Sequence, residues 1–128
     1  MNEFDTSALI SSCPVRDILN RLSDRWSLLT LHELMQTPVI RFGEFRRAIP
    51  DISPRMLSQT LRCLEQDGLI QREAYATIPP RVDYSLTPLG QSFMGVVEQL
   101  LQWAKVHQDD IHLARESYQA PEISNIAK

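Results

Sequence analysis

Apolar residues recur at helical spacing through the first half of the chain, which predicts helices there. A helix is expected to begin with Pro14 in its first position, because the apolar residues that follow are spaced i, i+3, i+4 and i+7: Val15, Ile18, Leu19 and Leu22. A second helix is expected from about Arg25 to Met35, with Asp24 as its N-cap and Pro38 beyond its end. A short extended stretch from Val39 to Phe42, interpreted as a short strand, is expected to follow.

The next two helices are separated by only a few residues. A short one is expected from Glu44 to Ile49. Ser53 followed by Pro54 is typical of a helix start, so a longer helix is expected from Ser53 to Asp67, with Gly68 just beyond its end. The buried side of this helix is expected to be Leu57, Leu61 and Leu64.

Beyond Gly68 the pattern changes to the alternation of β-strands. We expect strands from Ile70 to Ala76 and from Val82 to Leu86, joined by a tip from Thr77 to Arg81. Thr87 and Pro88 then begin a last helix that continues to about His112 or Ser117. The expected fold is therefore mainly α with a small β-hairpin (α+β), in the order of a winged helix-turn-helix.

The last helix has more apolar positions than one buried stripe needs, so it is expected to pack on a second surface as well as on its own domain. A dimer is also expected because winged helix-turn-helix domains bind DNA, and two domains on two DNA half-sites make more base contacts than one domain does. The expected homodimer interface residues are Leu9, Ile10, Phe93, Val97, Leu100 and Ala104.

The pattern divides the chain into four segments. We expect an N-terminal arm over residues 1–12, a winged helix-turn-helix DNA-binding domain over 13–88, a dimerisation helix over 89–117 and a flexible tail over 118–128.

Composition favours a cytoplasmic protein of ordinary globular type. The 128 residues are 43% hydrophobic and contain no apolar run of the ~20 residues that a membrane span requires. The first twelve residues contain no basic side chain and do not resemble a signal peptide. Cys13 and Cys63 are the only cysteines, which favours a reducing compartment.

The charge is distributed unevenly along the chain. The whole chain has a net charge of -3, yet residues 41–88 contain seven basic and six acidic residues, and all seven basic residues are arginines. Arginine suits bidentate contacts with phosphates and guanine edges. Four polar residues of the Ser53–Asp67 helix share one face, Arg46 and Arg47 suit phosphate contacts, and Arg81 belongs to the hairpin tip. The candidate DNA-binding residues are Arg46, Arg47, Ser53, Arg55, Ser58, Gln59, Arg62 and Arg81.

The chain also resembles the HxlR family of bacterial transcriptional regulators, a MarR-like winged helix-turn-helix group. The motifs that carry the resemblance lie between residues 13 and 104: Cys13-Pro14-Val15, Arg25-Trp26, Arg41-Phe42-Gly43-Glu44-Phe45, Ile52-Ser53-Pro54-Arg55, Asp67-Gly68-Leu69-Ile70, Pro79-Pro80-Arg81-Val82, Leu86-Thr87-Pro88-Leu89-Gly90 and Trp103. The resemblance implies a homodimer, formed by N- and C-terminal dimerisation helices, that binds double-stranded DNA at a pseudo-palindromic operator.

Cys13 is a candidate redox or electrophile sensor. It stands at a helix N-terminus, where the helix dipole stabilises a thiolate, and Arg16 is near in sequence. In the resembling family, a cysteine at this place serves some members as a sensor. The alternative is a structural residue that fits the start of the helix, and Cys63 is expected only to pack.

Neither a catalytic nor a metal site is expected, and no cofactor. The three histidines are not paired at i, i+4, and the chain has no phosphate-binding glycine loop. Two other functions remain open: a repressor with a small-molecule effector near Trp26 or Trp103, and a winged helix that binds only protein. The sequence does not reveal the operator, the target genes, the inducing signal, or whether the outcome is activation or repression.

Overall fold

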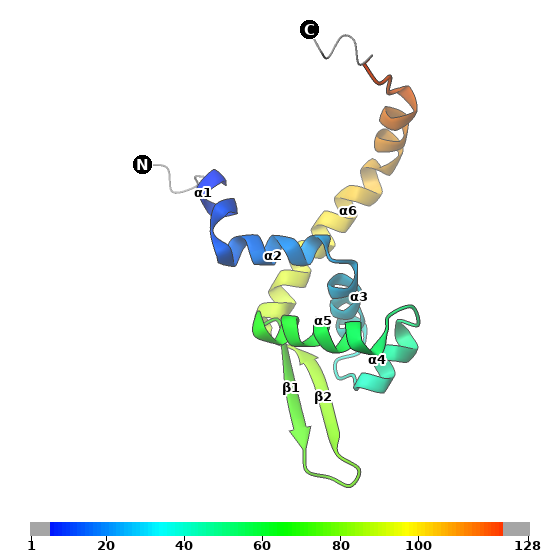
Figure 1. The fold of residues 1–128 in the computed structure, drawn as a ribbon. Coiled ribbons are helices and arrows are strands. Elements are labelled where there is room, and N and C mark those ends of the chain that lie inside the picture. Colours follow the sequence, from blue (N-terminus) through cyan, green and yellow to red (C-terminus); the bar gives the residue numbers. More distant parts are fainter. Residues whose placement is uncertain (1–5, 122–128) are drawn as a thin grey trace. The chain divides into compact units, whose positions relative to one another are not determined.

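The computed structural model describes residues 6–121, apart from the side chains of Ile10, Ser11, Cys13 and Pro14. The chain forms two compact units, residues 1–96 and 97–128, which divide within its last helix. The expected tail, residues 118–128, lies largely outside the described residues. The elements are α1 (Thr6–Ser11), α2 (Cys13–Ser23), α3 (Arg25–Gln36), α4 (Phe42–Ala48), α5 (Pro54–Gln66), β1 (Ile70–Tyr75), β2 (Arg81–Leu86) and α6 (Pro88–Ser117) (Figure 1).

Helices α3 and α5 begin at the capping residues that the sequence predicts, and α5 is followed by the predicted glycine. Asp24 caps α3 by accepting a hydrogen bond from the Trp26 backbone N–H at 3.2 Å. Ser53 caps α5 in the same way, with 3.1 Å between its Oγ and the Met56 nitrogen. Gly68 follows α5 with φ of +78°, a conformation that costs glycine little. These expectations are confirmed.

Two local expectations are wrong. The stretch from Val39 to Phe42 is not a strand: only Ile40 forms a β-bridge, with Tyr84. In addition, α4 begins at Phe42 rather than at Glu44. The reason is local, because Glu44 Oε1 accepts a hydrogen bond from the Arg41 backbone N–H at 3.0 Å and so brings the preceding turn into the helix.

The N-terminal segment contains a helix that the hydrophobic pattern does not predict. The expected arm, residues 1–12, contains the short helix α1 from Thr6 to Ser11, which packs against α2. Residues 1–5 of the arm lie outside the described residues. The segment has no amphipathic repeat long enough to predict a helix of six residues from sequence.

The core of the first unit lies between α3, α4, α5 and the hairpin. Each of these helices contacts its neighbours, α5 contacts β1, and both α3 and α4 contact β2. Phe45 of α4 is fully buried and meets Tyr84 of β2 edge-on, with ring centroids 6.1 Å apart. The largest side chains with 2% exposure or less in this core include Leu31, Leu34, Phe45, Leu57, Leu61, Leu64, Leu69 and Ile70.

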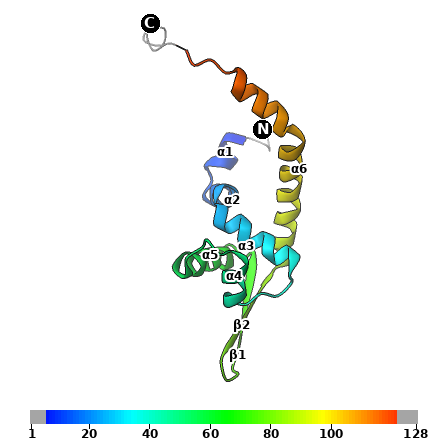
Figure 2. The same cartoon turned by 90° about the vertical axis from the view of Figure 1, so that its right-hand side faces the viewer.

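The hairpin projects from this core as a two-stranded antiparallel arm. Its register runs from Ile70 opposite Leu86 to Tyr75 opposite Arg81. Figures 1 and 2 show it extending away from α4 and α5 in both views, so that only its base is packed. Within residues 6–121, no helix combines the length and apolar character needed to cross a membrane.

Candidate nucleic-acid interface

The outer face of α5 presents the four polar side chains predicted to share it. Arg55, Ser58, Gln59 and Arg62 are all exposed. On the opposite face, Leu57, Leu61 and Leu64 are no more than 2% exposed. The helix is therefore fixed by its leucines and offers guanidinium, hydroxyl and carboxamide groups to solvent, as a helix that enters a major groove must.

Half of the six acidic residues in the arginine-rich segment 41–88 are paired with arginines. These pairs reduce the negative charge close to the interface. The ion pairs are Arg25–Asp51 at 3.8 Å, Arg21–Asp67 at 2.6 Å, and Asp83 with both Arg41 at 3.6 Å and Arg81 at 3.5 Å.

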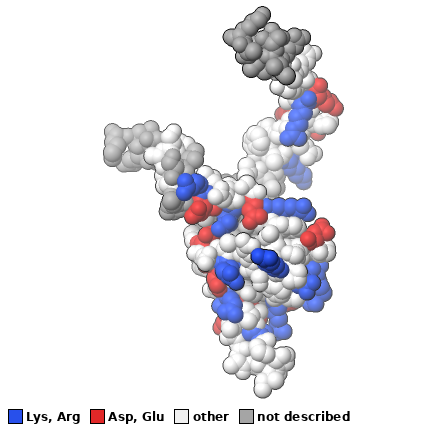
Figure 3. Space-filling model, viewed as in Figure 1, with Lys and Arg blue, Asp and Glu red and all other residues white. Residues whose placement is uncertain are grey.

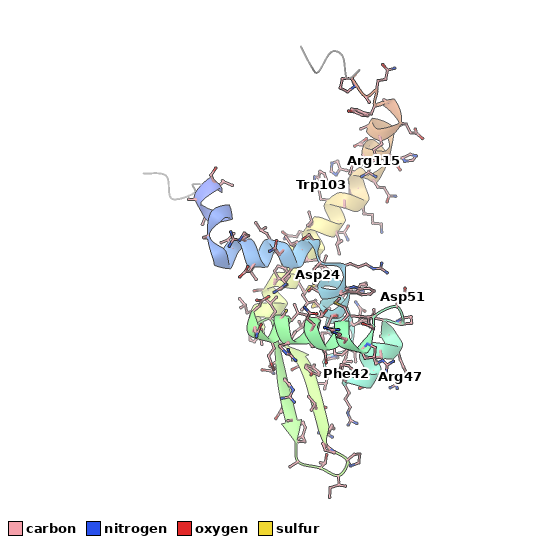
Figure 4. All side chains as sticks on the ribbon, in the orientation of Figure 1. Asp24, Phe42, Arg47, Asp51, Trp103 and Arg115 are labelled. Atoms are coloured by element: carbon pink, nitrogen blue, oxygen red, sulfur yellow. The ribbon has the colours of Figure 1, made fainter. Side chains whose placement is uncertain are left out.

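The remaining arginines of the segment are available for other partners. Among the described residues, none of them forms an ion pair, and all are exposed. Figure 3 shows arginine side chains over α4 and α5, and Figure 4 labels Arg47 on α4 and Asp51 on the loop that follows it. These arginines are Arg46, Arg47, Arg55, Arg62 and Arg72.

The C-terminal end of α5 is held by an ion pair with α2. Arg21 Nε donates to Asp67 Oδ2 at 2.6 Å, and both side chains are about four-fifths buried, with exposures of 21% and 17%. The hydrogen bond to Asp67 raises the pKa of the Arg21 guanidinium, against an opposing effect of burial. This contact fixes the end of α5 against the helix that begins at Cys13.

A cleft of about 340 Å³ separates α5 from the hairpin. Arg62 of α5 and Arg72 of β1 both line it, together with Ser58 and the acidic Glu65. Arg72 is the residue that sequence reasoning missed as a candidate contact. Strand alternation could have found it, because Arg72 shares a face of β1 with Ile70, and Ile70 is buried in the core.

A larger cleft of about 580 Å³ lies beside α4 and is less suited to phosphate. Arg41 and Arg47 line it, but so do Glu44 and Asp83. The four formal charges cancel, so this cleft does not favour an anion.

Two predicted DNA-binding residues have contacts within the protein. Ser53 Oγ caps α5 and remains exposed. The sequence places Arg81 in the hairpin tip, and this expectation is wrong. Arg81 is the first residue of β2 and lies directly opposite Tyr75. Its guanidinium lies 4.1 Å from the centre of the Tyr75 ring, in addition to its ion pair with Asp83. The true tip is the stretch 76–80.

The predicted sensor and part of the predicted dimer interface are only partly described. Cys13 is the first residue of α2, but its side chain and that of Ile10 lie outside the description. Leu9 and Ala104 are exposed, and Phe93 is half-buried. Val97 is only 2% exposed and so has little surface left for a partner.

The exposed apolar residues of α6 overlap only in part with the expected interface stripe. Leu100 is 49% exposed, as the interface prediction requires. Around it, however, Val96 and Trp103 are exposed at positions next to the predicted Val97 and Ala104. Sequence periodicity located the helix but not the angle at which it packs.

The tryptophans considered for an effector site belong to different units. Trp26 is half-buried beneath Arg25, whose guanidinium lies 4.7 Å from its ring centre. Trp103 is exposed and stacks on His107. Among the described residues, no group of three or more histidine, cysteine or acidic side chains is arranged to hold a metal ion.

Comparison with known proteins gives a consistent result. Residues 21–112 match the model of the HxlR-like helix-turn-helix family. The chain is 39% identical over 104 residues to an uncharacterized HTH-type transcriptional regulator, YtfH of Escherichia coli K12, covering 81% of this chain and 82% of that protein.

Solved structures agree with the sequence relatives. A MarR-family transcriptional regulator from Enterococcus faecalis V583 superposes with a TM-score of 0.70 at 30% identity, covering 88% of this chain and 94% of the other. The redox regulator HypR in its reduced form superposes with a TM-score of 0.68 at 37% identity, covering 82% and 99%.

Proposed function

This chain belongs to the HxlR-like helix-turn-helix family of DNA-binding transcriptional regulators, and from that premise we propose that it acts as a homodimer on a pseudo-palindromic operator. Its relatives are regulators and not enzymes. Because its partner is genomic double-stranded DNA, we expect it to act in the cytoplasm.

One observation carries the proposal: the outer face of α5. Its polar side chains are exposed together, whereas the leucines behind them are buried. An α-helix fits the B-DNA major groove, which is about 12 Å wide. In this arrangement Arg55 and Gln59 face base edges, where arginine pairs with guanine and glutamine with adenine, and Ser58 contributes a hydroxyl.

The other arginines are assigned to the phosphate backbone. Arg46 and Arg47 lie on α4, beside the helix that enters the groove, and neither has an ion-pair partner among the described residues. Arg62 and Arg72 line the cleft between α5 and the hairpin. Phosphate contacts set the orientation of a protein on DNA without reading its sequence.

The proposal is tested by binding to the DNA upstream of the protein's own gene at several salt concentrations. Arg55→Ala should weaken specific binding by about 1–3 kcal/mol for each subunit, and Arg46→Ala should weaken binding to all sequences and reduce the salt slope by about one unit for each subunit. Arg115→Ala, an exposed arginine of the second unit, is the matched control and should bind as the parent does. Equal effects of the α4 and α5 variants on specific and non-specific DNA would contradict this division of roles.

Dimerisation is supported by the apolar surface of α6. Leu100, Trp103 and Val106 are each about half exposed or more. Apolar side chains so exposed and so close along one helix are usually covered by a partner. A second copy of the chain is the partner that a pseudo-palindromic site requires, because protein and operator then share a twofold axis.

Regulation through Cys13 is the second part of the proposal. Cys13 opens α2, where the helix dipole favours a thiolate, and the structurally similar HypR is named a redox regulator. Diamide treatment should change DNA binding of the parent and of Cys63→Ser, but not of Cys13→Ser. The same response in all three proteins would remove Cys13 from the mechanism.

A further inference from the structure

We propose that Arg21 of α2 is a positioning residue for DNA recognition. Its ion pair with Asp67 sets the orientation of α5, and the reading of bases by Arg55 and Gln59 depends on that orientation. This inference rests on the proposed function and deepens it, because it makes sequence specificity depend on a helix that lies outside α4 and α5.

The guanidinium of Arg21 lies where three helices meet. Its Nε donates to Asp67 Oδ2, at the C-terminal end of α5, over 2.6 Å. Asp24, the N-cap of α3, and Cys63 of α5 also interact favourably with its charge. Since α2 packs mainly on α1 and α3, this charged contact connects it to the helix that reads DNA. Figures 1 and 2 show α2 beside α5 in both views.

The contact is directional, unlike the packing behind α5. The buried leucines hold the helix against the core through apolar contacts, which have no preferred direction. A charge-assisted hydrogen bond has a preferred length and angle. Arg21 provides such a bond on the α2 side of the C-terminal end, and the bond from Thr87 Oγ1 to the Gly68 carbonyl provides one from the start of α6. The orientation of α5 is therefore fixed by contacts at its end.

A small rotation of α5 produces a large displacement at the end that reads bases. Twelve residue steps separate Arg55 from Asp67, which at 1.5 Å per residue is about 18 Å. A rotation of about 10° over that length moves the far end by roughly 3 Å, whereas a binding group has to be held within about 0.5 Å of its productive position. Loosening the Asp67 end is therefore enough to impair base contacts by Arg55.

Electrostatics explain why the end of α5 moves when Arg21 is removed. Glu65 and Asp67 are acidic residues at the C-terminal end of the helix, where the helix dipole is also negative. Arg21 supplies the opposite charge from α2. Because the Arg21 and Asp67 side chains are only 21% and 17% exposed, loss of the arginine leaves a mostly buried carboxylate without its partner. The carboxylate is then solvated only if this end of α5 shifts toward water.

Arg21 acts through α5 and not by contacting DNA. Helical spacing places Cys63 and Asp67 on a flank of α5, between the buried leucines and the polar face. Arg21 is bonded to Asp67 on this flank and is mostly buried there. Replacing it should therefore remove no phosphate contact, in contrast to replacing Arg46 on α4.

The test measures binding of Arg21→Met to DNA from the region upstream of the protein's own gene and to a scrambled fragment of the same length, over a series of salt concentrations. We expect specific affinity to fall by about tenfold or more, with non-specific affinity and the slope of log K against log salt unchanged. Asp67→Asn should behave in the same way. Arg21→Lys, which keeps the charge but not the planar guanidinium, should recover part of the affinity.

Two control variants separate positioning from other effects. Arg115→Met makes the same substitution at an exposed arginine of the second unit and should bind as the parent does. Ile40→Ala truncates a buried side chain outside α2 and α5, so it lowers stability and leaves the ion pair in place. At a temperature where it is folded, it should keep the parent's ratio of specific to non-specific affinity.

A double-variant comparison locates the effect of Arg21 within the interface. Arg21→Met should cost less affinity in the Arg55→Ala background than in the parent, because the base contact that depends on Arg21 is already absent. In the Arg46→Ala background the cost should equal that in the parent, since Arg46 lies on α4.

Four outcomes overturn the inference while the proposed function stands. Parent-like specific affinity of Arg21→Met and Asp67→Asn removes the ion pair from recognition. A reduced salt slope in Arg21→Met makes Arg21 a phosphate contact. The same loss of specificity in Ile40→Ala assigns the effect to stability. Equal costs of Arg21→Met with and without Arg55 show that Arg21 does not act through that base contact. Failure of the parent to bind any DNA overturns the proposed function itself, and this inference with it.

Discussion

At the scale of single residues, the ion pair between Arg21 and Asp67 differs from the other ion pairs of the protein. It is short and mostly buried, whereas the Arg25–Asp51 pair spans 3.8 Å and is exposed. Exposed pairs contribute little because water screens them. A buried arginine bonded to a carboxylate contributes more, because removing either partner leaves the other charge unsatisfied.

Arg21→Met is therefore expected to lower the free energy of unfolding by about 1.5–3 kcal/mol. The arginine's pKa is raised in the folded protein, so its contribution is fully present below the pKa of the unfolded chain and is lost only as the pH rises through the folded value. Urea denaturation should accordingly show the same difference between variant and parent from about pH 7 to pH 10.

Asp51→Asn provides the matched comparison, because it removes an exposed pair and changes no buried group. It should lower the free energy of unfolding by less than about 1 kcal/mol. If the Arg21 and Asp51 variants are equally stable, burial is not what distinguishes the two pairs.

At the scale of elements, the junction between the hairpin and α6 is set by a close backbone approach. Thr87 Oγ1 donates to the Gly68 carbonyl at 2.6 Å and accepts from the Gly90 N–H at 3.0 Å. A Cβ on Gly90 would lie 2.0 Å from the Leu69 carbonyl oxygen. The first turn of α6 can therefore pack on the end of α5 only if this position has no side chain.

Gly90→Ala should lower the free energy of unfolding by at least about 3 kcal/mol, because a backbone atom has to move. Gly95→Ala lies in the same helix and is its control: a Cβ there meets nothing within 4 Å. That substitution should raise stability by about 0.5–1 kcal/mol through helix propensity. Denaturant midpoints measured on the two variants distinguish these effects, and equal midpoints would refute the steric account.

At the scale of the whole molecule, the second unit lacks a core of its own. Its described residues, 97–121, belong almost entirely to one helix, and its large apolar side chains are mostly exposed. An isolated helix in water derives most of its stability from packing of an apolar face. We therefore attribute the continuation of α6 to Ser117 to the packing of its apolar side chains against a partner chain.

Val106→Glu is expected to weaken the dimer by at least about tenfold, since the side chain is 71% exposed and a buried charge opposes association. Sedimentation velocity at a series of protein concentrations measures this change. Gln108→Glu adds the same charge to a polar position of the same helix and should leave the dimer intact. A parent protein that sediments as a monomer throughout would exclude the homodimer.

The sequence by itself determined the order of the helices and strands from α2 to α6 and the polar face of α5. Capping residues such as Asp24 and Ser53 act on the first turn of the helix that follows them, so their effect can be predicted from residues close in sequence. Helical spacing likewise assigns Arg55 and Gln59 to the face opposite the leucines, because the period of the helix is fixed.

Tertiary structure decided what depends on contacts between distant segments. Arg81 is held by Tyr75 and Asp83, and Arg72 lines the same cleft as Arg62, because strand register and helix packing bring these residues together. The same holds for the exposed apolar residues of α6, which include the predicted Leu100 but also Val96 and Trp103, next to the predicted Val97 and Ala104. Periodicity fixes which residues share a face, but the orientation of that face depends on the packing of the folded chain.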